Sequence, residues 1–326
     1  SSSSNPVAGS AVTITAQLAD TNSLPVATAG KTVTWSKTGV GGNFGSATSA
    51  TNSSGIATVV FTTGTVAGTV HAVTGTDNTS LTGTTANITT VPGTATKYLV
   101  TSSSYGPVAG ANVTITAQLS DANGNPVPTS GKTVTWSKTG AGGSFGSATS
   151  TTNGSGVATV VFTTGTVAGT VYAVTGTDNT SLTGTSPNIT TVPGPATKYL
   201  VTSSSYGPVA GANVTIAAQL ADMYGNAVAT SGKTVTWSKT GAGGTLGSPT
   251  STTNGSGVAT VVFTTGTVAG TVYAVTGTDN TSLTGTAPNI TTVPGSATKY
   301  IVGANRYSPA AGDAEGTVPQ LVGATN

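Results

Sequence analysis

Residues that could do chemistry are few in this chain of 326 residues, which contains eight carboxylates, ten basic residues, one histidine and no cysteine. No nucleophile, base and orienting group recur together, and no two carboxylates have a spacing that suggests general acid–base catalysis. His71 is replaced by Tyr172 and Tyr273 at the equivalent places of later repeats, so we expect it to be structural rather than catalytic or metal-binding. The sequence therefore predicts no enzyme activity, no catalytic residue and no cofactor.

Oxygen-bearing side chains gather at two turns of the middle of the chain, and calcium prefers oxygen ligands. In a seven-strand sandwich, the turn after the second strand and the turn before the last strand lie at one end. That topology would bring Asp121, Asn123 and Asn125 near Asp178 and Asn179. Each repeat offers only two carboxylates, however, and the alternative is that these residues only shape turns. We predict no metal site.

Three lysines raise the question of an intramolecular isopeptide bond to an asparagine, a crosslink that would replace disulfides: Lys132, Lys138 and Lys198. Such a bond needs a buried lysine next to a buried acid. These lysines lie near strand ends beside turns, which favours solvation of the ammonium groups instead.

Eleven asparagines begin an Asn-x-Ser/Thr sequence, the acceptor of N-linked glycans. They are Asn52, Asn78, Asn87, Asn112, Asn153, Asn179, Asn188, Asn213, Asn254, Asn280 and Asn289. Glycans would solubilise a surface with few charges. The alternative, left open, is that these asparagines are plain turn residues in a chain rich in Ser and Thr.

The elements that must position these residues recur along the chain. The stretch KTVTWSKTG begins at Lys31, Lys132 and Lys233, at a spacing of 101 residues. We predict modules at 1–94, 95–195 and 196–296, followed by a tail at 297–326. Catalysis seldom needs three copies of one site in series, whereas a spacer or a polymer gains length from each copy.

Each repeat predicts seven short strands separated by Gly, Asn and Pro, with no helical periodicity of useful length. In the middle repeat the predicted strands are 96–103, 112–121, 132–138, 144–151, 157–164, 170–176 and 182–192. Half-buried strands with turns at this interval predict an all-β fold of tandem immunoglobulin-like β-sandwich modules forming a rod. Trp35, Trp136 and Trp237 fall on the third strand, where we expect a core anchor.

The segment DANGNPVPTSGKTVTWSKTGAGGSFGSATSTTNGSGVATVVFTTGTVAGTVYAVTGT, from Asp121 to Thr177, resembles the bacterial immunoglobulin-like repeats of the invasin and intimin type. The resemblance covers the core of all three repeats. It implies a bacterial or archaeal surface protein in which stacked modules form a stalk or fibre, and it implies no enzyme activity.

The two ends of the repeat array differ from its middle. Pro6-Val7-Ala8-Gly9 aligns with Pro107-Val108-Ala109-Gly110, so the first module lacks the strand ATKYLVT that precedes the later modules. The tail supplies a similar strand with no complete module after it. We predict it as a candidate donor strand: Ala297, Thr298, Lys299, Tyr300, Ile301 and Val302. The alternative is that the tail opens a fourth module in a longer array.

The charge pattern limits the partners. Only 6% of residues are charged, the net charge is +2, and the basic residues are scattered singly, so no basic stripe exists for a nucleic acid. No apolar run is long enough for a membrane span. We expect an extracellular or cell-surface structural subunit whose partners are copies of itself. The alternative is a stalk of an adhesin or carbohydrate-binding protein, in which Tyr172, Tyr273 or Tyr105 contacts sugars.

Overall fold

The computed structural model describes residues 1–304 and 317–323, and every regular element in these ranges is a β-strand. The predicted all-β class is confirmed. No helix that could span a membrane occurs in the described part of the chain. The chain divides into two compact units: one consists of Ser1–Pro107, Ala111–Thr164 and Thr170–Thr190, and the other of Val108–Gly110, Gly165–Gly169 and the described residues from Thr191 onward.

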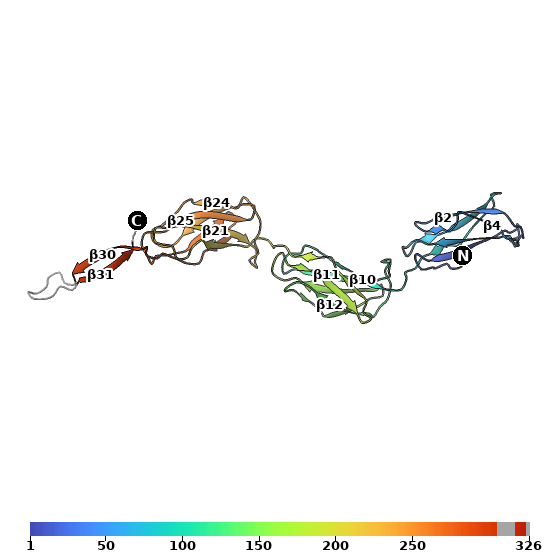
Figure 1. Cartoon of the computed structure of the whole chain (residues 1–326), viewed down its shortest axis with the longest axis horizontal. Coiled ribbons are helices and arrows are strands. Elements are labelled where there is room, and N and C mark those ends of the chain that lie inside the picture. The colour runs from blue at the N-terminus through green and yellow to red at the C-terminus, as the bar shows by residue number, and fades with distance from the viewer. Residues whose placement is uncertain (305–316, 324–326) are drawn as a thin grey trace, which may run out of the picture. The chain divides into compact units, whose positions relative to one another are not determined.

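The first repeat contains β1 (Ala11–Gln17), β2 (Thr32–Lys37), β3 (Asn43–Phe44), β4 (Thr48–Ala50), β5 (Ile56–Thr62), β6 (Val70–His71), β7 (Val73–Asp77), β8 (Thr82–Thr84) and β9 (Ile88–Thr89). The second contains β10 (Lys97–Ser102), β11 (Asn112–Ser120), β12 (Thr133–Lys138), β13 (Ser144–Phe145), β14 (Thr149–Thr151), β15 (Val157–Thr163), β16 (Val171–Tyr172), β17 (Val174–Asp178), β18 (Thr183–Thr185) and β19 (Ile189–Thr190). The third contains β20 (Lys198–Ser203), β21 (Asn213–Ala221), β22 (Thr234–Lys239), β23 (Thr245–Leu246), β24 (Thr250–Thr252), β25 (Val258–Thr264), β26 (Val272–Tyr273), β27 (Val275–Asp279), β28 (Thr284–Thr286) and β29 (Ile290–Thr291). The tail contributes β30 (Ala297–Ala304) and β31 (Thr317–Gly323) (Figure 1).

The second and third repeats have the same pair of four-stranded antiparallel sheets. Their strand orders are β10-β11-β15-β13 and β14-β12-β17-β18, then β20-β21-β25-β23 and β24-β22-β27-β28. The first repeat has the order β4-β2-β7-β8 in one sheet but only β1-β5-β3 in the other. The described chain therefore contains two complete sandwiches and one in which the outer edge of β1 has no strand beside it.

Three of the seven strands predicted for the middle repeat are each split in two. The strand predicted at 144–151 becomes β13, which pairs with β15, and β14, which pairs with β12, because the chain crosses from one sheet to the other between them. The strand predicted at 170–176 is interrupted at Ala173, whose N–H donates to the Thr139 hydroxyl instead of to a neighbouring strand. The last predicted strand similarly divides into β18 and β19.

Alternation along the strands places apolar side chains in three core clusters. The clusters lie within residues 12–88, 98–189 and 199–290, and they define what we call the first, second and third modules. Each cluster falls inside one of the predicted ranges 1–94, 95–195 and 196–296, whose boundaries stay a prediction. Trp136 is buried as expected, and its indole N–H donates to the Ser150 hydroxyl at 2.9 Å.

The solvent-facing side of the sheet that contains β17 and β18 carries pairs of threonines instead of charges. Thr175 and Thr185 share a hydrogen bond between their hydroxyls at 2.8 Å. The pairs Thr74–Thr84 and Thr276–Thr286 make the same 2.8 Å contact in the other modules. Cross-strand pairs of this kind stabilise a sheet without any charge.

His71 is a core residue of the first module, and among the described residues it belongs to no cluster of acidic, histidine or cysteine side chains. It is fully buried, and its ring meets that of Phe61 edge to face, with ring centres 5.1 Å apart. Its Nδ1 lies 3.1 Å from the Thr38 carbonyl oxygen, but Nε2 has no hydrogen-bond partner. The tyrosines at this position satisfy their polar end, since the Tyr172 hydroxyl donates to the Ala141 carbonyl at 2.8 Å.

We expect His71→Tyr to stabilise the first module. The substitution removes a buried unpaired nitrogen and adds a hydroxyl that can donate to the Val40 carbonyl, the equivalent of Ala141. The gain should be about 1–2 kcal/mol in the free energy of unfolding, measured by urea denaturation of the whole chain. The reverse change in the second module, Tyr172→His, should lower stability by a similar amount. Equal stability of both variants and the parent chain would contradict this account.

Candidate functional site: an open groove and the module junctions

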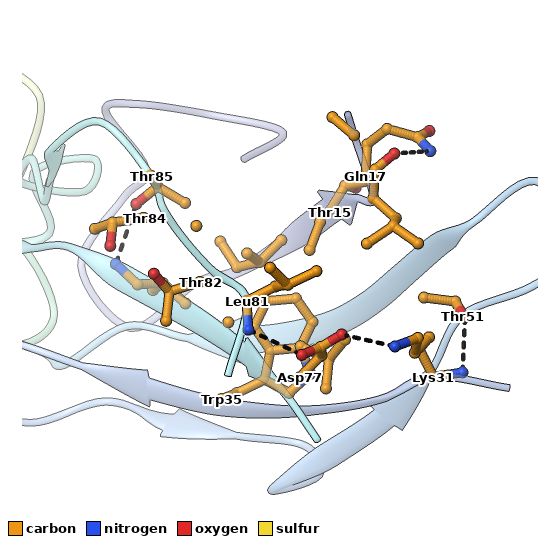
Figure 2. Close-up of a pocket in the computed structure, with 18 of the residues that line it drawn as sticks. Thr15, Gln17, Lys31, Trp35, Thr51, Asp77, Leu81, Thr82, Thr84 and Thr85 are labelled. Carbon is orange, nitrogen blue, oxygen red and sulfur yellow. Dashed lines mark hydrogen bonds and ion pairs between the residues drawn. The ribbon is translucent and has the colours of Figure 1, made fainter. Parts of the chain in front are cut away.

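The first module contains a groove of about 630 Å³ along the outer edge of β1. Strands β1, β2, β7 and β8 line it, with Trp35 and Val33 contributing apolar surface. Figure 2 shows Thr15 and Gln17 on one side, Thr82 and Thr84 on another, and Lys31 next to Asp77. The groove is bounded by a strand edge, apolar side chains and one carboxylate, which together suit an extended peptide.

The equivalent space in the second module is filled by that module's own first strand, β10. Tyr98 and Val100 of β10 are 2% and 4% exposed. The Tyr98 hydroxyl donates to Oδ2 of Asp178 at 3.3 Å. The backbone carbonyl oxygen of Tyr98 lies over Gly184, so a Cβ at position 184 would collide with that oxygen. In the third module β20 does the same with Tyr199, Val201 and Asp279.

The first module shows what the strand would cover. Nothing lies within 4 Å of where a Cβ on Gly83 would stand, although Gly83 is the equivalent of Gly184. Leu18 and Ala16 are only partly buried, whereas their equivalents Leu119 and Ala117 are at most 1% exposed. In the first module Ser2 bonds Thr13 of β1, with its N–H donating to the Thr13 carbonyl at 2.9 Å and its hydroxyl accepting the Thr13 N–H at 3.0 Å. The rest of the β1 edge and the apolar floor lie in the groove with no strand over them.

Electrostatics match the groove to a tyrosine-bearing strand. Burial acts to raise the pKa of Asp279, but hydrogen bonds from Thr281, Leu283 and Tyr199 outweigh it and lower this pKa. Burial and the neighbouring carboxylate raise the pKa of Tyr199 to about 12, so its hydroxyl keeps its proton and donates. Asp77 is the equivalent carboxylate of the open groove; its Oδ2 lies 3.5 Å from Lys31 Nζ and accepts the Thr79 hydroxyl at 3.0 Å.

The candidate donor strand at 297–302 forms most of β30, which pairs with β31 in an antiparallel hairpin. The register places Tyr300 opposite Leu321 and Val302 opposite Pro319. Tyr300 and Val302 are 71% and 67% exposed, although their equivalents in the second and third modules are buried. In the structure the strand is thus paired along one edge, while the face that would enter a core is uncovered.

A second recurring feature joins the second and third modules each to the one before it. The turn at residues 121–125 reaches the end of the first module, where Asp121 Oδ2 accepts the N–H of Gly93 at 2.9 Å. The Asn125 side chain donates to the Thr65 carbonyl and accepts the N–H of Ala67, both at 2.9 Å. We call this set of three hydrogen bonds the junction lock.

The turn at residues 222–226 forms the same junction lock with the end of the second module. Asp222 accepts the N–H of Gly194 at 2.9 Å, and Asn226 bonds the Thr166 carbonyl at 2.9 Å and the Ala168 N–H at 2.8 Å. Burial alone would raise the pKa of Asp222. Hydrogen bonds from the Asn226 side chain and from the N–H groups of Gly194, Asn226 and Tyr224 outweigh burial and lower the pKa to about 2.

The residues of the calcium hypothesis belong to two different hydrogen-bond networks. Asp121 belongs to the junction lock, and Asn125 donates to it at 2.9 Å within the turn. Asp178 instead accepts hydrogen bonds from Thr180, Leu182 and Tyr98 in another network. No group of three or more acidic, histidine or cysteine side chains that could hold a metal occurs in residues 1–304 and 317–323. The carboxylates of both networks orient turns, which is the alternative interpretation.

The three lysines considered for a crosslink all make non-covalent contacts. Lys132 Nζ lies 3.3 Å from the Thr180 hydroxyl and 4.0 Å from Asp178 Oδ2. Lys138 and Lys198 donate to the carbonyls of Gly140 and Met223. These contacts fit the solvated role.

The sequence predicts two sets of residues that would carry or contact sugars: asparagines as glycan acceptors and tyrosines as sugar-binding residues. All eleven asparagines of the Asn-x-Ser/Thr sequences are exposed. Among the aromatic residues expected to contact sugars, Tyr172 and Tyr273 are fully buried, so that expectation is wrong for both. They fill the core position that His71 takes in the first module. Tyr105 is 42% exposed.

No protein-family model matches the chain, and no curated protein matches it. Several solved structures do. FdeC, an adhesin of Escherichia coli, is 19% identical, and the match covers 89% of this chain and 94% of FdeC with a TM-score of 0.39. Invasin, a bacterial integrin-binding protein, is 21% identical over 92% of this chain and 60% of invasin, with a TM-score of 0.37. The D00-D0 domain of intimin is 16% identical over 60% of this chain and all of that domain, with a TM-score of 0.38. Invasin and intimin are also the proteins whose repeats the sequence motifs resemble.

Sequence reasoning missed the junction lock and the Tyr98–Asp178 contact. The signal for the lock was present, because Asp121 and Asp222 are each followed four residues later by asparagine. The sequence predicts that this end of the module faces the module before it, with oxygen ligands that could hold calcium there, whereas the structure shows direct hydrogen bonds across the junction.

The junction lock should weaken in acid. Because the pKa of Asp222 falls from 3.8 to about 2 on folding, its ionised form stabilises the fold above about pH 4, and this contribution is lost as the pH falls toward 2. We therefore expect Asp222→Asn to lower the free energy of unfolding near pH 6 more than near pH 2, measured by urea denaturation. Asp20→Asn, in a turn whose equivalent oxygen makes no such bond within one copy, is the control and should show little change in the unassembled chain. A pH-independent effect of Asp222→Asn would contradict the prediction.

Proposed function

We propose that the chain is a structural subunit of an extracellular filament or cell-surface fibre, in which copies assemble head to tail. Strand β30 of one copy would enter the first-module groove of the next copy and complete its sandwich. The observation that carries the proposal is the open groove, because the same space in the second and third modules holds a strand of nearly the same sequence. Its partners are therefore further copies of the same chain.

The register of the donated strand follows from the filled modules. Tyr98 pairs with Leu119 and Val100 pairs with Ala117 in the second module. The same register would place Tyr300 opposite Leu18 and Val302 opposite Ala16. The Tyr300 hydroxyl would then reach Asp77, as the Tyr98 hydroxyl reaches Asp178.

Burial supplies the driving force for this exchange of partners. Tyr300 and Val302 are largely exposed in the hairpin, and each such side chain stabilises by roughly 1.5–3 kcal/mol when it is fully buried. The groove gains as well, since Leu18, Ala16 and Leu81 would be covered. The open edge of β1 is an aggregation hazard that a specific partner strand removes.

The sequence of β31 supports its role as a temporary partner rather than as the second strand of another module. In β21 the Leu220 N–H donates to the Gly257 carbonyl, at the side of the strand that faces β25. Because N–H groups of a strand point alternately to its two sides, the Ala218 N–H faces β25 as well. Pro319 stands at the position of Ala218 and has no N–H to offer. If β31 were the second strand of another module, the strand that pairs with its far edge would therefore lack one hydrogen bond at Pro319.

A second candidate function is a stalk segment of a surface adhesin, in which the tail begins another module. One observation favours it: the register of β30 with β31 repeats that of β20 with β21 at the 101-residue offset, with Tyr199 opposite Leu220 and Tyr300 opposite Leu321. The two candidates share an extracellular, cell-surface location. Six of the exposed asparagines make no side-chain hydrogen bond in the described part of the chain, and N-glycans are proposed there first: Asn78, Asn87, Asn179, Asn188, Asn280 and Asn289.

Substitution of Tyr300 tests strand donation. Tyr300→Thr removes the side chain that would fill the groove, so we expect the filaments seen by negative-stain microscopy to disappear or the concentration needed for assembly to rise roughly tenfold to a hundredfold. Deletion of residues 297–326 should abolish assembly.

Ile301→Thr is the matched control, because Ile301 lies on the opposite face of the same strand and its equivalent Leu99 is 42% exposed in a filled module. This variant should assemble as the parent chain does. Filaments that persist unchanged in Tyr300→Thr and in the deletion would overturn strand donation, and would point instead to another strand in the groove, such as one preceding Ser1 in a longer chain.

A further inference from the structure

Two halves of a junction lock have no partner in the described part of the chain. The turn at residues 20–24 is the first module's equivalent of the turns at 121–125 and 222–226. Asp20 Oδ1 accepts the N–H groups of Asn22 and Leu24 at 2.9 Å, as in the other turns. Asp20 Oδ2, which is the oxygen that reaches the preceding module in the other turns, accepts no hydrogen bond within the described residues.

The complementary half lies at the end of the third module. The carbonyl of Thr267 and the N–H groups of Ala269 and Gly295 are the equivalents of the groups that Asn226 and Asp222 bond at the second junction. None of the three makes a hydrogen bond within residues 1–304 and 317–323. The hairpin supplies no acid here, because Gly323 stands at the register position of Asp222 and pairs with Ala297.

We infer that these two halves meet between copies: Asp20 of one copy accepts the Gly295 N–H of the copy that donates the strand. This inference rests on the proposed strand donation. When β30 lies in the groove of the next copy, the first module of that copy takes the position that a fourth module would have in the donating chain. The end of the third module is then a docking surface for the turn at residues 20–24 of a second copy.

Spacing along the chain brings the two groups together. Gly93 precedes Lys97, Gly194 precedes Lys198 and Gly295 precedes Lys299 by four residues in each case. Lys97 and Lys198 pair with Ser120 and Ala221, the residues directly before Asp121 and Asp222. In the donated register Lys299 pairs with Ala19, directly before Asp20. A strand seated in the groove therefore carries Gly295 to Asp20.

The lock between copies is incomplete at one residue. Leu24 stands where Asn125 and Asn226 stand in the internal locks, and it is 60% exposed. Its side chain cannot bond the Thr267 carbonyl or the Ala269 N–H. One of the three junction hydrogen bonds thus forms between copies, so the joints between copies are weaker than the joints within a copy. Leu24→Asn should complete the lock and slow the release of subunits from filaments on dilution, and Leu24→Ala should not.

Engineered disulfides provide the decisive test, because the chain has no cysteine of its own. A Cβ added to Gly93 would lie 3.6 Å from the Cβ of Asp121, and one on Gly194 would lie 3.7 Å from that of Asp222. These separations suit a disulfide. The experiment mixes full-length Asp20→Cys with full-length Gly295→Cys that carries a longer tag, and follows assembly and oxidation on non-reducing gels. A single chain with Gly93→Cys and Asp121→Cys is the positive control for the geometry, and Asp20→Cys mixed with Gly194→Cys is the negative control.

We expect a heterodimer that forms only in the mixture of Asp20→Cys and Gly295→Cys, disappears on reduction and is lost when the Gly295→Cys chain also carries Tyr300→Thr. Filaments without the heterodimer would overturn this inference and leave strand donation standing. Absence of both filaments and heterodimer, with the positive control closed, would overturn the proposed function and this inference with it. A heterodimer that forms equally well with Tyr300→Thr would show docking without the strand, which contradicts the inference as stated.

Discussion

The pairing of the first strand with the second determines whether a module of this chain is complete. An edge strand presents N–H and C=O groups and one apolar face, and all of these need a partner. In the second and third modules β10 and β20 supply it, with a buried tyrosine bonded to a carboxylate of the opposite sheet. In the first module the same edge is open. The roles proposed for the groove, for β30 and for the turn at residues 20–24 all follow from this single unmet pairing.

Because the three modules have nearly the same sequence, equivalent positions in them can be compared directly. A position that is filled in the second and third modules but open in the first shows which contacts this fold can make there. Gly184 lies beneath the Tyr98 carbonyl, whereas Gly83 has open space above it. Asn125 and Asn226 reach across to the preceding module, whereas Leu24 points to solvent.

Much of the fold could be predicted from the sequence, because period-two alternation and turn residues are local signals. The strand predicted at 112–121 is confirmed as β11, in which Val113, Ile115 and Ala117 form one buried face. The split of the strand predicted at 144–151 could not be foreseen, because it depends on which sheet each half joins. The candidate donor strand was predicted from the repeat, whereas the groove and the contacts of Asp77 depend on packing that the sequence does not show. The junction lock could not be predicted in full, because an aspartate and an asparagine four residues apart in a turn do not show which backbone groups they bond.

The threonine pairs on the outer strands have a consequence for where such a protein can work. Threonine hydroxyls on neighbouring strands form hydrogen bonds with each other at 2.8 Å. Only two ion pairs join side chains in residues 1–304 and 317–323. Dissolved ions screen charges but leave neutral hydrogen bonds nearly untouched. These hydrogen bonds between outer strands are therefore almost independent of salinity and keep their strength from fresh water to brine.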